Sequence, residues 1–294
     1  MASYKLWLAG LPGLLGLSRA QAQEIDLGRA TYGVSAVRAN GRRQLVQQPA
    51  LDVRLPLYQH AGTRLGAALS YRALLSGDLA GIDNLQGLGG QLVLGQRLTD
   101  KNTLTVAASG GVYADWRDVR GEDFRWTATG QLRHRYSASL AVGVGLNYNR
   151  QFFGNQLVPY LDVQWAITAR LRLTGQPPFR QQLVYALTPR LGLGLDASGT
   201  STSYRLSART DSSRYVQATQ WNVGALVEYR LAPHWVLVAQ AGRLAVQDYR
   251  TFASDVRVPW TIGLGRGGTR TPLTEVSSPS WTGQLTLAFR LGQP

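Results

Sequence analysis

The stretch from Thr219 to Gly242 reads TQWNVGALVEYRLAPHWVLVAQAG. Apolar residues occupy every second position of its first half, the spacing typical of a strand: Trp221, Val223, Ala225, Val227, Tyr229 and Leu231. Most of the intervening residues are small or polar: Asn222, Gly224, Glu228 and Arg230. Ala232-Pro233-His234 then interrupts the pattern, because proline cannot donate into a ladder, and a second strand begins at Trp235. Each half exceeds the roughly 9–11 residues that cross a bilayer as a tilted strand. The stretch therefore predicts one hairpin of a membrane barrel.

The same unit recurs along the chain, for example in residues 51–57, 65–73, 140–148 and 281–291. Tight polar turns are expected at 60–62, 99–102, 136–139, 188–190 and 232–234, with longer loops between them. Segment 169–188 is ambiguous, so the count is about 12 or about 14 strands, both even as in bacterial outer-membrane barrels. The expected fold class is all-β, a closed antiparallel transmembrane β-barrel. Residues 248–279, rich in Gly, Pro, Thr and Ser, are expected to form an irregular outer loop able to fold over the mouth.

The N-terminus has the three parts of a secretory signal. Lys5 precedes an apolar stretch from Leu6 to Leu17, and the small-x-small motif Ala20-Gln21-Ala22 follows. Residues 1–22 are therefore expected to be removed on export, leaving a barrel over 23–294; a buried N-terminal helix is the alternative. With no cysteine in the sequence, disulfides, thiolate metal sites and a lipoprotein anchor are excluded.

Composition favours acidic neighbours. The formal net charge of +14 falls to +12 when Lys5 and Arg19 are removed with the signal. Such a balance suits lipid phosphates, lipopolysaccharide or small anionic solutes. Nucleic acid is not expected as a partner, because the chain is exported and its basic residues are scattered. No segment approaches 18 consecutive apolar residues, so a membrane location requires strands.

Several short motifs recur in the strands and turns: Val158 to Trp165 (VPYLDVQW), Pro177-Pro178, Tyr185 to Leu191 (YALTPRL), Ser203 to Leu206 (SYRL), and Trp221 with Glu228 to Leu231 (EYRL). Together they resemble an outer-membrane β-barrel family known as a domain of unknown function. The resemblance implies a barrel in the outer membrane, and it carries no established activity and no site residues. Barrels of the MltA-interacting protein and OmpV group share similar turns, so that assignment stays open. The barrel-assembly machinery is an expected partner. Short turns on one side imply that both chain ends lie in the periplasm.

Alternation also predicts which side chains face the lumen. The candidate lumen-lining residues are Arg54, Arg72, Arg97, Asp115, Arg125, Arg133, Arg135, Asp162, Glu228, Arg230 and Arg290. Arginines outnumber carboxylates in this set, which favours anionic solutes if the lumen is open. The alternative is a network of paired charges that fills a closed barrel. An aromatic girdle at the membrane interface is expected from Trp116, Trp126, Trp165, Trp221, Trp235 and Trp281.

Catalysis is not expected. The histidines are His60, His134 and His234; two fall in predicted turns and His134 is on the outward face, without a partner serine in a nearby motif. Neither a metal site nor a cofactor is expected. The function that the sequence favours is a passive channel or an envelope-structural barrel. A lipid-modifying hydrolase at the membrane rim and a secreted soluble β-sandwich are the alternatives.

Overall fold

The computed structural model describes residues 25–39, 41–79, 82–207, 213–264 and 270–291. The expected signal peptide, 1–22, lies outside these residues. One short 3-10 helix, η2 (Gly121–Asp123), accompanies the strands: β1 (Ile25–Ala39), β2 (Arg42–His60), β3 (Thr63–Leu79), β4 (Ile82–Arg97), β5 (Asn102–Ala114), β6 (Phe124–Arg135), β7 (Leu140–Gln151), β8 (Gly154–Ala166), β9 (Leu171–Gln176), β10 (Arg180–Ala186), β11 (Leu191–Leu206), β12 (Arg214–Ala232), β13 (Trp235–Ala253), β14 (Val258–Ile262), β15 (Thr274–Ser277) and β16 (Ser280–Leu291).

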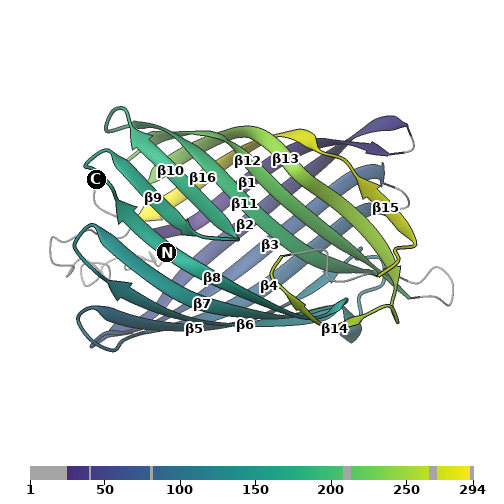
Figure 1. The fold of residues 1–294 in the computed structure, drawn as a ribbon, viewed down its shortest axis with the longest axis horizontal. Helices are drawn as coiled ribbons and strands as arrows, with labels where there is room; N and C mark the ends of the chain where they lie inside the picture. Colours follow the sequence, from purple (N-terminus) through teal and green to yellow (C-terminus); the bar gives the residue numbers. More distant parts are fainter. Residues whose placement is uncertain (1–24, 40, 80–81, 208–212, 265–269, 292–294) are drawn as a thin grey trace, which may run out of the picture.

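The strands close into a barrel. β1 to β13 pair in sequence order, β13 pairs with β16, and β16 returns to β1 with Ile25 opposite Leu291. The result is the expected closed antiparallel barrel, with 14 strands. Segment 169–188 contributes a complete though short hairpin, β9–β10, which fixes the higher count. Figure 1 shows the tilted strands, with the short turns β2–β3, β4–β5, β6–β7, β8–β9, β10–β11 and β12–β13 at one end and β14 and β15 at the other. The connections β1–β2, β3–β4 and β7–β8, at the second end, are also short, whereas those from β5 to β6, from β11 to β12 and from β13 to β16 are longer. We name the first end the turn end and the second the loop end.

The outward face is apolar and exposed over most of the wall, as a bilayer requires. In β12, for example, Val223 is 58% exposed and Leu231 51% exposed. The opposite face is largely polar, but Leu226 departs from the sequence pattern: it is buried against Val184 and Val238 on the inner wall. No helix among the described residues is long and apolar enough to cross a membrane, and this finding concerns helices alone.

The barrel is narrower at the loop end than at the turn end, because the strands of its wall differ in length. β9 and β10 have 6 and 7 residues, whereas β12 and β13 have 19 each. Above the β9–β10 hairpin, β11 loses its neighbour and crosses to β5, where Arg205 lies opposite Ala114 in a parallel pairing. Fewer strands therefore enclose the loop end than the turn end. A barrel of about 8 strands is just filled by its own side chains.

An apolar core fills this narrowed end. It is built from the inner faces of β1 to β4 and β11 to β13 with β15: Val37, Ala39, Val46, Leu74, Leu79, Ile82, Leu85, Tyr204, Val216, Ala218, Tyr249 and Val276. We call it the loop-end core. The axial exit of the barrel is packed with these side chains.

The expected irregular stretch 248–279 is more ordered than the sequence pattern indicates. β13 extends into this stretch and ends at Ala253. β14 pairs in parallel with the edge of β8, with Val258 opposite Gly154 and Ile262 opposite Leu157. β14 occupies the side of the wall where β9 and β10 stop short (Figure 1). This part of the loop therefore extends the barrel wall and does not cover the mouth of the barrel.

Candidate functional site

The inner wall holds two networks of charged and polar side chains. In the first, Arg133 donates to Asp162 at 2.6 Å, and Gln176 bridges Asp162 to Gln131. These residues come from β6, β8 and β9. They meet because β7 has glycines between them: a Cβ at Gly145 would lie 2.2 Å from the ring of Tyr160. The glycine alternation of β7 is thus the sequence feature that lets β6 and β8 share a network.

The second network follows the turn end of the wall. Arg290 of β16 donates to Asp26 at 2.7 Å and approaches Glu228 of β12 at 4.0 Å. Arg172 of β9 also pairs with Glu228, reaching over β10 and β11. Only the concave inner face allows contacts that skip strands in this way, so these groups face the lumen.

The remaining inner carboxylates are paired as well. Asp52 lies 3.8 Å from Arg72, and Asp196, only 1% exposed in its side chain, accepts from Arg180 at 2.8 Å. Four further arginines expected in the lumen occupy inner-face positions near the turn end: Arg54, Arg97, Arg135 and Arg230.

Two predicted lumen residues lie elsewhere. Asp115 follows the end of β5, where its carboxylate accepts from the hydroxyl and the N–H of Ser207, at 2.6 and 3.0 Å. It ties the end of β11 to β5 instead of lining the lumen, because alternation stops where the strand ends. Arg125 is at an inward position of β6, as its register predicts. At this level of the barrel, however, β11 has crossed over the inner side of β6. The side chain of Arg125 is therefore enclosed between β6, β7 and β11 and is 8% exposed.

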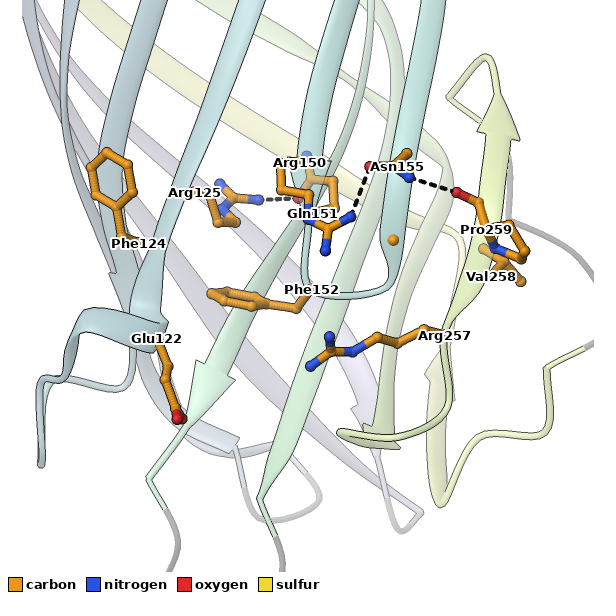
Figure 2. Close-up of a pocket in the computed structure, with 11 residues that line it drawn as sticks. Glu122, Phe124, Arg125, Arg150, Gln151, Phe152, Asn155, Arg257, Val258 and Pro259 are labelled. Atoms are coloured by element: carbon orange, nitrogen blue, oxygen red, sulfur yellow. Dashed lines mark hydrogen bonds between the residues drawn. The ribbon is translucent and has the colours of Figure 1, made fainter.

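A cavity of about 530 Å³ opens beside Arg125 at the loop end (Figure 2). We call it the loop-end pocket. It is lined by Glu122, Phe124, Arg125, Arg150, Gln151, Phe152, Gly154, Asn155, Arg257, Val258 and Pro259. Figure 2 shows the guanidinium groups of Arg125, Arg150 and Arg257 around the space beside Phe152. Glu122 is the one carboxylate among the lining residues, and it pairs with Arg205 at 2.9 Å.

The contacts of Arg125 are to uncharged groups. Its guanidinium donates to the Gln151 side chain, lies 3.5 Å from the Ser203 hydroxyl and stacks 3.6 Å from the Tyr113 ring centroid. Its Nε is buried and has no hydrogen-bond partner among the described residues. Gln151 also accepts from the Ser203 hydroxyl at 2.8 Å and from the Ser203 N–H at 3.2 Å. We call this contact among Arg125, Gln151 and Ser203 the seam.

Comparison with known proteins adds the family. A domain-of-unknown-function model, DUF6268, matches residues 82–256, more than half of the chain. The chain belongs to the DUF6268 family. No curated protein matches the sequence.

Among solved structures, the NanC porin has 9% identity and a TM-score of 0.43, covering 90% of this chain and all of its own. The toluene transporter TodX of Pseudomonas putida has 11% identity and a TM-score of 0.34, covering 90% of each chain. The translocator domain of the autotransporter NalP from Neisseria meningitidis has 9% identity and a TM-score of 0.35, covering 95% of this chain and 91% of its own.

The tryptophans expected in a girdle occupy both ends of the DUF6268 barrel. Trp165 and Trp235 lie near the turn end, and Trp126 and Trp281 near the loop end, all at least 41% exposed. The two others are Trp116, which follows β5 and donates to the Gln86 carbonyl, and Trp221, whose ring covers Gly199. The alternation missed Trp260, which is 58% exposed on β14.

The three histidines, His60, His134 and His234, lie at or near strand ends. His134 contacts the amide oxygen of Asn102 at 2.7 Å and the ring of Tyr136. His234 lies at the β12–β13 turn against Phe289, and His60 lies at the end of β2 near Tyr58. Within the described part of the chain, no group of three or more His, Asp or Glu residues has the arrangement to hold a metal ion.

Reasoning from the sequence also missed Arg29, Arg172, Arg180, Asp26 and Asp196 on the inner wall and Arg150 and Arg257 in the loop-end pocket. Arg172 and Arg180 were not predicted as inner-wall residues, because β9 and β10 are too short to show a clear alternation of apolar and polar residues. A usable signal existed for β14, where Val258, Trp260 and Ile262 alternate with Pro259 and Thr261.

Proposed function

We propose that the protein is an outer-membrane channel for small anionic solutes, closed at its loop end in this conformation. The proposal places both ends of the barrel sequence in the periplasm, because β1 starts and β16 ends at the turn end, the end that carries the short turns in bacterial outer-membrane barrels. The loop end then faces the outside.

The observation that carries the proposal is the charge of the inner wall. Each inner carboxylate named above has an arginine partner, and arginines remain in excess at the turn end, where Arg54, Arg97 and Arg135 lie. A lumen with excess cationic side chains attracts anions and repels cations.

Solvent reaches this wall. The side chains of Arg72 and Arg172 are 57% and 39% exposed. The loop-end core, in contrast, is buried throughout. This contrast describes a water-filled vestibule that opens at the turn end and is closed at the loop end. Passage requires β11 to move away from β5 or the seam at Arg125 to open.

The test is the reversal potential of purified protein in planar bilayers under a KCl gradient. We expect brief conductance steps with the sign of an anion-selective pore. Replacing Arg54, Arg97 and Arg135 together by Gln should move the reversal potential toward zero. Replacing Arg38, Arg42 and Arg43, which lie at the loop end of β1 and β2, is the matched control and should leave it in place. Cation selectivity, or an unchanged potential in the first variant, contradicts the proposal.

The second candidate is a structural barrel that conducts nothing. The completeness of the loop-end core favours it. Folded protein, judged by heat-modifiable gel migration, that never conducts would decide for this candidate.

A further inference from the structure

The loop-end pocket contains a buried cation that has no counter-ion within the part of the chain that the structure describes. Arg125 is 8% exposed, forms no ion pair among the described residues, and leaves its Nε without a hydrogen bond. Burying a charge is costly unless it is paired and hydrogen-bonded. Aromatic stacking on Tyr113 offsets part of this cost. The unmet Nε and the adjoining cavity leave room for an anionic group supplied by a ligand.

Two more arginines enlarge the positive site. Arg150 donates to Asn155 at 2.8 Å, and Arg257 donates to the Ser254 carbonyl at 2.8 Å; neither forms an ion pair in the described structure. Both line the same cavity as Arg125. Guanidinium groups bind phosphate through paired N–H donors, so three of them suit a phosphate better than a single carboxylate.

An aromatic surface adjoins the positive site. The rings of Trp126 and Tyr148 lie 4.9 Å apart and those of Tyr148 and Trp260 lie 5.9 Å apart, measured between centroids, both pairs in tilted arrangements. Phe124, which lines the pocket, is 54% exposed, and Ile262 of β14 is 76% exposed. We call Phe124, Trp126, Tyr148, Trp260 and Ile262 the aromatic patch. It lies on the outward face, where a barrel in a membrane meets acyl chains.

Asn155 connects the two surfaces. Its Oδ1 accepts from the Tyr148 hydroxyl at 2.7 Å and from Arg150 at 2.8 Å, and its Nδ2 donates to the Pro259 carbonyl at 2.9 Å. The aromatic patch and the arginines are therefore parts of one site that spans the wall beside β14. A ligand that fills it has a phosphate at one end and hydrocarbon at the other.

We propose that the loop-end pocket binds a phosphorylated glycolipid of the outer leaflet, the lipid A portion of lipopolysaccharide. Its phosphate sits among Arg125, Arg150 and Arg257, and its acyl chains lie on the aromatic patch. The inference rests on the membrane orientation given under the proposed function, and it does not require conduction.

Binding to purified barrel in neutral detergent tests this separately from conductance. The probes are lipid A, dephosphorylated lipid A and inorganic phosphate, measured by native mass spectrometry and tryptophan fluorescence. We expect lipid A to bind about tenfold or more tightly than either other probe. Arg125→Gln and Arg257→Gln should each weaken lipid A binding by about tenfold, whereas Arg54→Gln, in the lumen, should not change it. Trp260→Ala should weaken binding of lipid A and leave binding of phosphate unchanged.

Three results would overturn the proposal. Equal affinity for lipid A and its dephosphorylated form removes the role of the arginines. Equal affinity for lipid A and inorganic phosphate removes the role of the aromatic patch. Unchanged binding in Arg125→Gln and Arg257→Gln, with heat-modifiable migration intact, places any lipid elsewhere on the barrel.

Discussion

At the scale of single residues, the buried arginines of the barrel have two kinds of partner. Arg133 on the inner wall pairs with Asp162, whose side chain is only 5% exposed, so each charge supports the other. Arg125 in the seam is 8% exposed, and its partners among the described residues are uncharged. The first arrangement stabilises the fold. The second is costly in the ligand-free protein, and this cost supports the anion site that we propose in the loop-end pocket.

This difference gives opposite expectations for matched substitutions. Arg125→Met should raise the free energy of unfolding of the ligand-free barrel by about 1 kcal/mol, because an unpaired buried charge is removed. Arg133→Met should lower it by about 2 kcal/mol, because buried Asp162 then has no cation. Urea unfolding followed by tryptophan fluorescence measures both. A lower stability for Arg125→Met would show that its stacking and hydrogen bonds outweigh its desolvation.

At the scale of elements, β14 depends on one glycine. Gly154 has a positive φ of +124°, and a Cβ there would lie 1.8 Å from the Val258 carbonyl oxygen. The pairing of β14 with β8 is therefore possible only without a side chain at this position. Pro159 suits the edge of β8 beyond β14, since a proline leaves no N–H unpaired there.

Gly154→Ala should detach β14 while leaving the barrel closed. Thr261, 7% exposed on β14, provides the reporter: Thr261→Cys introduces the only thiol of the chain. A maleimide should label this cysteine slowly when Gly154 is retained and at least about tenfold faster when Gly154→Ala is added, because displacement exposes the side chain. Gly130→Ala is the control, since a Cβ there meets nothing within 4 Å. Equal labelling in all three proteins would mean that β14 is held by other contacts.

The same elements show how far sequence alone reaches. Long alternating strands such as β12 and the tight turns were predictable, because alternation and turn residues are local signals. The crossing of β11 to β5 was not, since it follows from the shortness of β9 and β10 and from a single pairing far apart in sequence, Arg205 with Ala114. Alternation predicts an inward register for Arg125. Its enclosure depends on that crossing, so the pocket beside it was out of reach.

At the scale of the whole molecule, the barrel has two different ends. The turn end carries inner-face arginines such as Arg54, Arg97 and Arg135, and the loop end is filled by the loop-end core. In the channel that we propose, the contact between β11 and β5 is the gate. Asp115 and Ser207 hold that contact, with 2.6 Å between the carboxylate and the hydroxyl.

The most direct test locks this contact covalently in bilayers. The chain has no cysteine, so Asp115→Cys with Ser207→Cys gives a single possible disulfide. Asn102→Cys with His134→Cys, paired at the turn end of β5 and β6, is the control for cross-linking as such. We expect the 115–207 pair to conduct anions when reduced and to fall silent when oxidised, with the control conducting in both states. Unchanged conductance in the oxidised 115–207 protein would contradict a gate at the loop end.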